Sequence, residues 1–308
     1  MLNMIMSFGL PGVMAQGIIW GLMAIGVYIT FKILDIADLT VDGSFATGGA
    51  VLVMSVTQYG MNIWISLLLA FIAGCLAGLM TGIFHTKFGI PAILSGILTQ
   101  FALYSINLRI LTCANVALNV RKYSDVVLIS SFYTTDALIK CAIFAAIIIG
   151  LLYLFFGTQL GQSLRATGCN PNMSRANGIN TERNKILGLV ISNGVVALSG
   201  GLLAQYQGFA DINMGRGAIV IGLAAVIIGE VLFAKIYRNL AVRFTSAIVG
   251  GILYYVIISL VLRMGLKADD LKLLTAIVVA IFLGIPFWKK SIMDSRIKKG
   301  VESNVKNQ

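Results

Sequence analysis

The sequence predicts an all-α fold, a polytopic bundle of about nine transmembrane helices, with roughly eight to ten compatible with the pattern. Three observations predict it: hydrophobic residues make up 58% of the 308 residues, charged residues make up only 11%, and the basic residues gather in gaps between apolar runs. A soluble domain carries about 25% charged residues. A soluble globular protein and a disordered one are therefore both excluded, and we expect a single transmembrane domain over residues 1–308.

Nine apolar segments are long enough to cross a bilayer, because a helix needs about 20 residues to span about 30 Å of hydrocarbon. They cover 13–34, 42–59, 63–84, 90–110, 136–156, 185–207, 217–234, 245–262 and 271–288. The second and the seventh are short and rich in glycine, which favours broken or re-entrant helices. We expect no ionisable residue at the middle of the membrane.

Positive charge predicts the orientation. Lys and Arg number 23 against 12 Asp and Glu, a net charge of +11. Cytoplasmic segments of membrane proteins carry an excess of Lys and Arg, so the basic C-terminal tail is placed inside. Counting back nine spans puts 32–42, 85–89, 157–185 and 235–244 inside as well. The pattern predicts a multi-pass protein of the bacterial cytoplasmic membrane, in contact with the lipid bilayer and not with nucleic acid.

The sequence contains a weak internal repeat at an offset of 173 residues. The matching pairs are Ile18/Ile191, Gly21/Gly194, Ala24/Ala197, Ala37/Ala210, Asp38/Asp211, Gly49/Gly222 and Gly78/Gly251. In the expected topology the first half, about 13–110, enters the membrane from outside and the second half, about 185–288, from inside. This predicts an inverted repeat, an architecture expected of transporters; chance matching in a chain rich in Gly and Ala is the alternative.

The polar, basic segment 157–185 separates two long spans and has the signals of two short helices. Gln162 to Thr167 is the first, and Pro171 to Asn177 is the second, with Pro171 suited to a first helical turn. Gly168 and Gly178 would end the two helices, because glycine accepts the left-handed conformation at a helix terminus. Such a lobe would give a peripheral partner a surface to push against; the alternative is an ordinary basic loop that anchors topology.

Within this segment the stretch L-R-A-T-G-x-N-P-x-x-x-R-A-N-G-I-N resembles the cytoplasmic loop of permease subunits of ABC importers. The resemblance is to the branched-chain amino acid and ribose permease family, and it continues into the Gly-rich stretch Ala224 to Glu230, where Glu230 departs from the usual small residue. It covers most of the chain and is most specific over about 160–230. The chain looks somewhat closer to a subgroup linked to aromatic amino acid uptake.

The resemblance implies a permease subunit that moves a small solute inward, with an amino acid, and an aromatic one in the nearer subgroup, as the expected cargo. It implies separate ATPase subunits that bind ATP, an extracytoplasmic substrate-binding protein, and a second permease copy, identical or homologous. The chain has no G-x-x-x-x-G-K-[ST] motif, so no P-loop. We therefore expect no catalytic site and no cofactor in this chain.

By the resemblance, segment 157–185 is the part that couples to the ATPase. The residues expected to do so are Arg165, Gly168, Asn170, Pro171, Arg175, Gly178 and Ile179. The arginines would contact acidic or backbone acceptors, the glycines would permit close approach, and the isoleucine would fill an apolar notch. The expected translocation pathway is lined by small and polar residues: Asp38, Thr40, Ser44, Thr99, Asn107, Asn193 and Asn213.

Two alternatives use other residues. Asp35, Asp38 and Asp42, spaced three and four apart, would share one helical face and serve an ion-coupled secondary transporter. In the plainer interpretation this segment is an interfacial turn in which Asp38, Thr40 or Asp42 caps the next short helix, with Asp211 and Asn213 as the equivalent cap in the second half. An intramembrane enzyme or metal site has little support, because the chain has one histidine and its four cysteines form no C-x-x-C pair.

Overall fold

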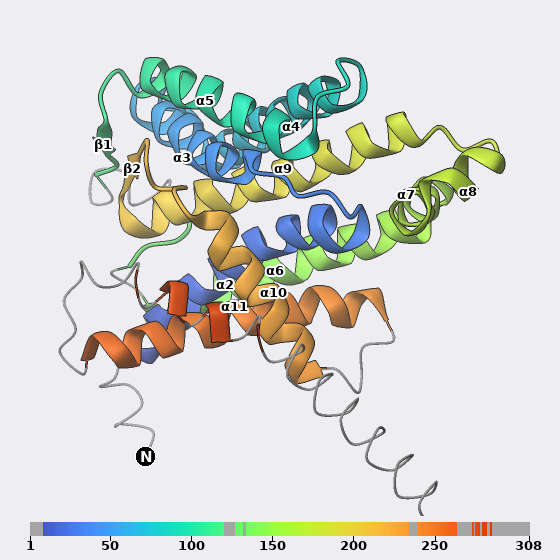
Figure 1. Ribbon diagram of the computed structural model, residues 1–308. Helices are drawn as coiled ribbons and strands as arrows, with labels where there is room; N and C mark the ends of the chain where they lie inside the picture. The colour runs from blue at the N-terminus through green and yellow to red at the C-terminus, as the bar shows by residue number, and fades with distance from the viewer. Residues whose placement is uncertain are drawn as a thin grey trace, which may run out of the picture.

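The computed structural model describes residues 9–119, 127–131, 134–233 and 239–263, together with several residues between 273 and 284. The described chain is almost entirely helical (Figure 1). Its one described sheet is a short antiparallel ribbon in which β1 (Asn115–Ala117) pairs with β2 (Phe209–Asp211). The all-α prediction is confirmed.

Six helices of the described chain are long and apolar enough to cross a membrane. They are α2 (Leu10–Tyr28) with its π-helical extension η1 (Ile29–Ile33), α4 (Ile63–Thr86), α5 (Ala92–Leu111), α6 (Thr134–Gly157), α9 (Thr181–Gln207) and α11 (Leu240–Arg263). Each coincides with a predicted span. The last predicted span, 271–288, lies mostly outside the described residues.

The two glycine-rich segments form shorter helices, α3 (Thr40–Thr57) and α10 (Ala218–Phe233). Both are continuous, so the expectation of broken helices is wrong within these bounds. Most of α3 is buried against other helices, including α4, α5 and α9. Its glycines serve this packing: at Gly48 no room remains for a Cβ beside the backbone of Ala197.

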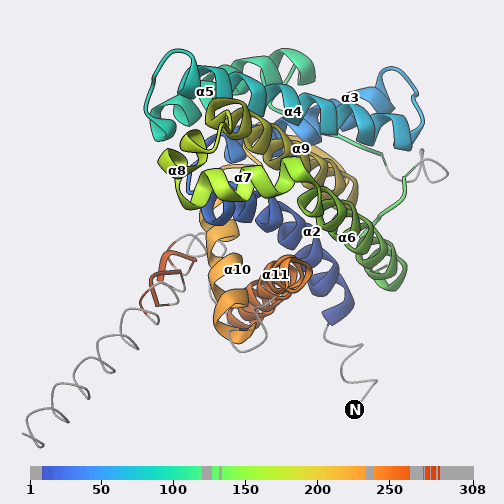
Figure 2. The same cartoon turned by 90° about the vertical axis from the view of Figure 1, so that its right-hand side faces the viewer.

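The bundle has two groups of helices that meet along α2 and α9 (Figures 1 and 2). Helices α3 and α4 pack on α9, α5 packs on α3 and α4, and α10 and α11 pack on α2. This arrangement follows the predicted repeat, in which α2, α3 and α4 correspond to α9, α10 and α11. A Cβ at Gly21 would lie 2.7 Å from Cα of Ile248, and a Cβ at Gly194 would lie 2.7 Å from Sγ of Cys75. These two contacts are equivalent at the offset of 173.

Helices α2 and α9 run antiparallel and are joined by hydrogen bonds at a regular spacing. Three side chains of α9 that lie seven residues apart donate to three carbonyl oxygens of α2 that also lie seven residues apart, in reverse order. The pairs are Ser192 to Gly26 (2.8 Å), Ser199 to Ile19 (2.6 Å) and Tyr206 to Gly12 (3.0 Å). Since the two helices are equivalent in the repeat, their opposite directions support an inverted repeat. Sequence reasoning missed these serines, which have no local signal.

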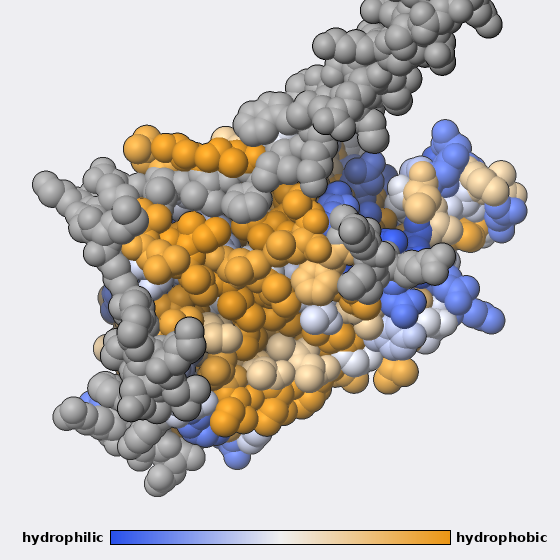
Figure 3. Space-filling model, turned by 90° about the horizontal axis from the view of Figure 1, so that it is seen from below, coloured by the Kyte–Doolittle hydropathy of each residue, from blue (hydrophilic) through white to orange (hydrophobic). Residues whose placement is uncertain are grey.

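The outer surface is apolar over the length of the spans. Seen from below, the molecule presents a broad hydrophobic face that gives way to hydrophilic residues toward one end (Figure 3). On α6, Ile139, Ile143, Ile147, Leu151 and Leu154 are all more than half exposed. Such an apolar stripe is stable in lipid and unstable in water, so these residues face the hydrocarbon core.

Candidate functional site

A helical lobe at one end of the molecule is made by α7 (Gln159–Cys169) and α8 (Pro171–Ala176), at the ends of α6 and α9 (Figures 1 and 2). The two predicted helices are confirmed. The Asn170 side chain accepts a hydrogen bond from the Met173 N–H (3.0 Å) and caps α8, with Pro171 as its first residue. Gly178 follows α8 with φ +78°, the left-handed conformation that favours glycine.

The prediction that Gly168 ends the first lobe helix is wrong. Helix α7 continues through Gly168 to Cys169, so the glycine does not end it. A Cβ at this position would collide with the carbonyl oxygen of Ile33 at the end of η1. Gly168 therefore allows close packing of α7 against the end of η1.

The other residues expected to couple to an ATPase lie on the lobe with different accessibility. Arg165, Asn170, Pro171, Arg175 and Gly178 are exposed. Ile179 is half-buried, and its N–H donates to the Ser174 carbonyl oxygen. The exposed residues form the part of the lobe that a partner can reach.

The lobe is tied to the start of α9 by side-chain hydrogen bonds. Arg175 Nε donates to Thr181 Oγ1 (2.8 Å), and Asn184 Nδ2 donates to Thr167 Oγ1 (2.8 Å). Both contacts link the lobe to the first turns of α9. The lobe and the start of α9 are therefore joined directly.

Near the middle of α9, Asn193 joins a buried cluster of polar residues. Asn193 Nδ2 donates to Asp38 Oδ2 (2.7 Å), and Ser44 Oγ donates to Asn193 Oδ1 (2.6 Å). Asp38 is 2% exposed, and its Oδ1 accepts the Thr40 N–H (2.9 Å). A carboxyl group thus lies beside the centre of a membrane-spanning helix, which corrects the expectation of no ionisable residue at that depth.

Threonines extend the cluster to α4 and α5. Thr40 Oγ1 lies 2.7 Å from Thr81 Oγ1, which donates to Thr99 Oγ1 (2.9 Å). Five of the seven expected pathway residues therefore meet in one cluster: Asp38, Thr40, Ser44, Thr99 and Asn193. All five are buried, so in this conformation they join helices and do not line an open path.

The three aspartates do not share a helical face, because residues 35–39 are not helical. Asp35 is exposed with φ 56°, and Asp38 lies against α9. Asp42 Oδ2 and Oδ1 accept the N–H groups of Gly217 (2.9 Å) and Ile219 (3.0 Å), so it caps α10 and not its own helix. In the described part of the chain no three acidic, His or Cys side chains gather as a metal site.

The prediction that Asp211 and Asn213 cap the short helix of the second half is wrong, because α10 begins only at Ala218 and Asp42 accepts the N–H groups at its start. Asp211 Oδ1 accepts the Asn213 N–H (2.6 Å), and this bond is equivalent to the one between Asp38 and Thr40. Asn213 is exposed, apart from the buried cluster.

Asn107, the remaining expected pathway residue, lines a cavity of about 370 Å³. The cavity lies between α3 and α5 and is also bordered by the segment that precedes α10. Its lining includes Gly43, Gln100, Tyr104 and Arg216.

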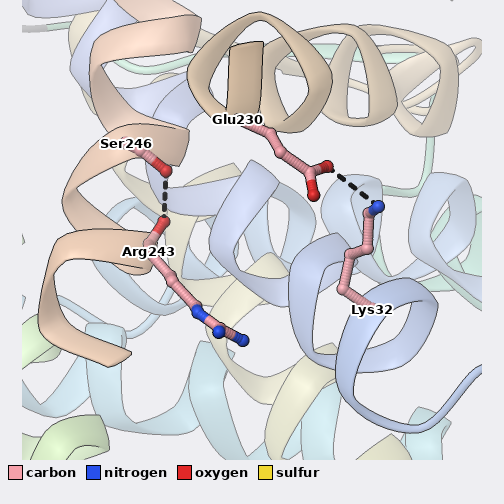
Figure 4. Close-up of polar contacts among 4 residues, drawn as sticks. All are labelled: Lys32, Glu230, Arg243 and Ser246. Carbon is pink, nitrogen blue, oxygen red and sulfur yellow. Dashed lines mark hydrogen bonds and ion pairs between the residues drawn. The ribbon is translucent and has the colours of Figure 1, made fainter. Parts of the chain in front are cut away.

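An ion pair between the halves was not located from the sequence. Lys32 Nζ of η1 lies 2.8 Å from Glu230 Oε2 of α10 (Figure 4). The same view shows Ser246 Oγ donating to the Arg243 carbonyl oxygen (2.7 Å) on α11. Glu230, the departure from the family pattern, is thus held by a cation from the other half.

Comparison with known proteins agrees with this architecture. The family model described as "Branched-chain amino acid transport system / permease component" matches residues 9–287. A tyrosine transport system permease protein of Clostridioides difficile is 44% identical over 275 residues, 89% of this chain and 90% of the relative. An uncharacterised protein of Rickettsia prowazekii is 35% identical over 270 residues, 87% and 94% of the two chains.

A more distant relative, the autoinducer 2 import system permease protein LsrC of Yersinia pseudotuberculosis, is 26% identical over 291 residues, 93% of this chain and 77% of the relative. No solved structure gives a significant match. With six helices able to cross a membrane and a family match over most of its length, the chain is a multi-pass membrane protein that belongs to the branched-chain amino acid permease family.

Proposed function

We propose that this chain is the permease subunit of an ABC importer that carries an aromatic amino acid into the cell, with L-tyrosine as the first substrate to test. The family and the tyrosine permease of Clostridioides difficile support an amino acid as cargo. ATP is bound and hydrolysed by separate ATPase subunits. A substrate-binding protein delivers the amino acid from outside, and a second permease copy completes the pathway.

The observation that carries the proposal is the connection of the lobe to the buried polar cluster through one helix. Helix α9 has 27 residues and is about 40 Å long. The lobe is bonded to its first turns, and Asn193, near its middle, holds Asp38 and Ser44. When an ATPase moves the lobe, α9 moves with it and the contacts around Asp38 rearrange.

The exposed arginines of the lobe are the proposed contacts with the ATPase. Arg165 and Arg175 are exposed on the lobe, and guanidinium groups pair well with carboxylates. Arg175 also holds Thr181, so its substitution would disturb the lobe itself. Arg165 is therefore the cleaner position to test.

An ion-coupled secondary transporter has less support. It would need Asp35, Asp38 and Asp42 to act together, and the fold directs them to solvent, α9 and α10 respectively. The proposed energy source is accordingly a partner subunit.

The test is uptake of radiolabelled L-tyrosine by cells of the native bacterium that carry a variant in place of the natural gene. Arg165→Glu should reduce uptake at least about tenfold, because it reverses a charge that faces the ATPase. Lys87→Glu makes the same change in charge at an exposed position outside the lobe and should retain normal uptake. Membrane levels of both variants are measured by immunoblot. Normal uptake by the Arg165 variant, or no tyrosine uptake by the unaltered protein, contradicts the proposal.

A further inference from the structure

The cavity between α3 and α5 has the features of a ligand site. We propose that it is a binding site within the permease for an amino-acid zwitterion that bears an aromatic or apolar side chain. This inference rests on the proposed function and deepens it. Its volume of about 370 Å³ falls in the range of about 300–1,000 Å³ that is typical of small-molecule pockets.

Helix α5 has a polar face that lipid does not explain. Among the six membrane-crossing helices it has the lowest mean hydropathy, 1.2, against 1.7 to 2.5 for the others. Gln100, Tyr104 and Asn107 are spaced four and three residues apart and so lie on one face of the helix, and all three line the cavity. Polar side chains within a membrane normally face a pathway or another helix.

Asn107 supplies an acceptor with no partner. Its side chain is 1% exposed, and its Oδ1 has no hydrogen-bond partner among the residues that the structure describes. A buried carbonyl oxygen without a partner is costly. An ammonium group of a ligand in the cavity would donate to this oxygen and remove that cost.

Arg216 supplies a positive charge at the same cavity. Its guanidinium can donate two parallel hydrogen bonds to a carboxylate, and within the described ranges no carboxylate forms an ion pair with it. Asp42, the acidic residue in the lining, already accepts two backbone N–H groups of the turn into α10. The arrangement therefore offers a cation for the ligand carboxylate and leaves Asn107 to accept from the ammonium.

The remaining lining accounts for the side chain of the ligand. Phe101 and Tyr104 present aromatic rings, and Gly43 and Ala46 of α3 add small apolar surface. Aromatic rings stack on other rings with a preference for offset or edge-on geometry. An amino acid with a flat or apolar side chain matches this surface better than a charged one.

The test is equilibrium binding of radiolabelled L-tyrosine to the purified full-length chain in lipid nanodiscs. Two competitors separate the groups of the zwitterion: the des-amino analogue of tyrosine lacks the ammonium, and tyramine lacks the carboxylate. Asn107→Leu should weaken tyrosine binding about tenfold or more, the usual effect of losing a hydrogen bond to a charged group. It should leave binding of the des-amino analogue unchanged. Asn107→Asp keeps the acceptor and should retain tyrosine binding.

Arg216→Gln should show the complementary pattern, with weaker binding of tyrosine and of the des-amino analogue and unchanged binding of tyramine. Ile106→Ala is the matched control, since Ile106 is 47% exposed on α5 and does not line the cavity. The inference is overturned if Asn107→Leu weakens all three compounds alike, weakens none, or behaves as Ile106→Ala does.

The same measurement distinguishes the site from the proposed function. If cells import tyrosine through this permease but the purified chain does not bind it, the cavity is not a substrate site and the function stands. If the purified chain binds tyrosine through Asn107 but cells do not import it, the site stands and the proposed function fails.

Discussion

The turns that precede α3 and α10 are equivalent in the repeat but lie in different surroundings. Each contains an aspartate that accepts the N–H two residues ahead, Asp38 from Thr40 and Asp211 from Asn213. Asp38 is buried and also bonded to Asn193 of the opposite half, whereas Asp211 is only half-buried and belongs to the β1–β2 ribbon. The position equivalent to Asn193 is Trp20, whose indole N–H finds no hydrogen-bond partner in the described part of the chain.

This difference shows that one local turn serves two purposes. In the first half the short-range bond from Asp38 reaches Thr40, the first residue of α3, whereas in the second half the bond from Asp211 closes a turn that ends before α10 begins at Ala218. Only in the first half does a second bond connect that helix start to α9, and through it to the lobe. The two halves therefore share a fold, while the connection to the lobe is asymmetric.

The largest expected effect is the difference in stability between a variant of Asp38 and a variant of Asp211. Asp38→Ala leaves the Asn193 amide and the Thr40 N–H without their buried acceptor, and each bond to a charged group contributes about 1.5–3 kcal/mol. We expect a loss of at least about 3 kcal/mol in the free energy of unfolding. Asp211→Ala removes a single hydrogen bond within a turn at a half-buried position and should cost about 1 kcal/mol.

Thermal unfolding of the two variants in detergent, followed by loss of helical circular dichroism, measures the comparison. Uptake of tyrosine in cells should fall in the same order. Equal melting temperatures would mean that the bond between Asp38 and Asn193 does not hold the halves together.

A smaller effect is expected where the halves meet at the periphery. Lys32 and Glu230 form an ion pair with side chains that are 35% and 36% exposed, and exposed pairs contribute about 0–1 kcal/mol. A double-mutant cycle with Lys32→Ala and Glu230→Ala should give a coupling energy below about 1 kcal/mol. A coupling as large as the effect of Asp38→Ala would place the main connection between the halves at this ion pair and not at the buried cluster.

Sequence patterns correctly predicted the elements that interactions between neighbouring residues determine. The second lobe helix was found because Pro171 suits its first turn and Gly178 follows it, and each signal acts within a few residues. The long spans were found for a similar reason, since apolar runs of sufficient length leave few alternatives in lipid.

The predictions were wrong where a segment distant in the sequence determines the local structure. Gly168 has the signal of a helix end, but the helix continues to Cys169, and the glycine instead leaves room for the carbonyl oxygen of Ile33. The spacing of Asp35, Asp38 and Asp42 indicates one helical face only if the segment is helical. The chain is not helical at 35–39, and α9 and α10 bind two of the three carboxylates. No pattern within the segment predicts those partners.

The side of the membrane on which the lobe lies can be measured with two native thiols. Cys169 ends α7 in the lobe, and Cys113 follows α5 at the other end of a span; both are exposed. In intact cells a membrane-impermeant maleimide should label Cys113 and leave Cys169 unlabelled until the membrane is permeabilised. Labelling of Cys169 in intact cells would put the lobe outside, beyond reach of any ATPase, and would contradict the account.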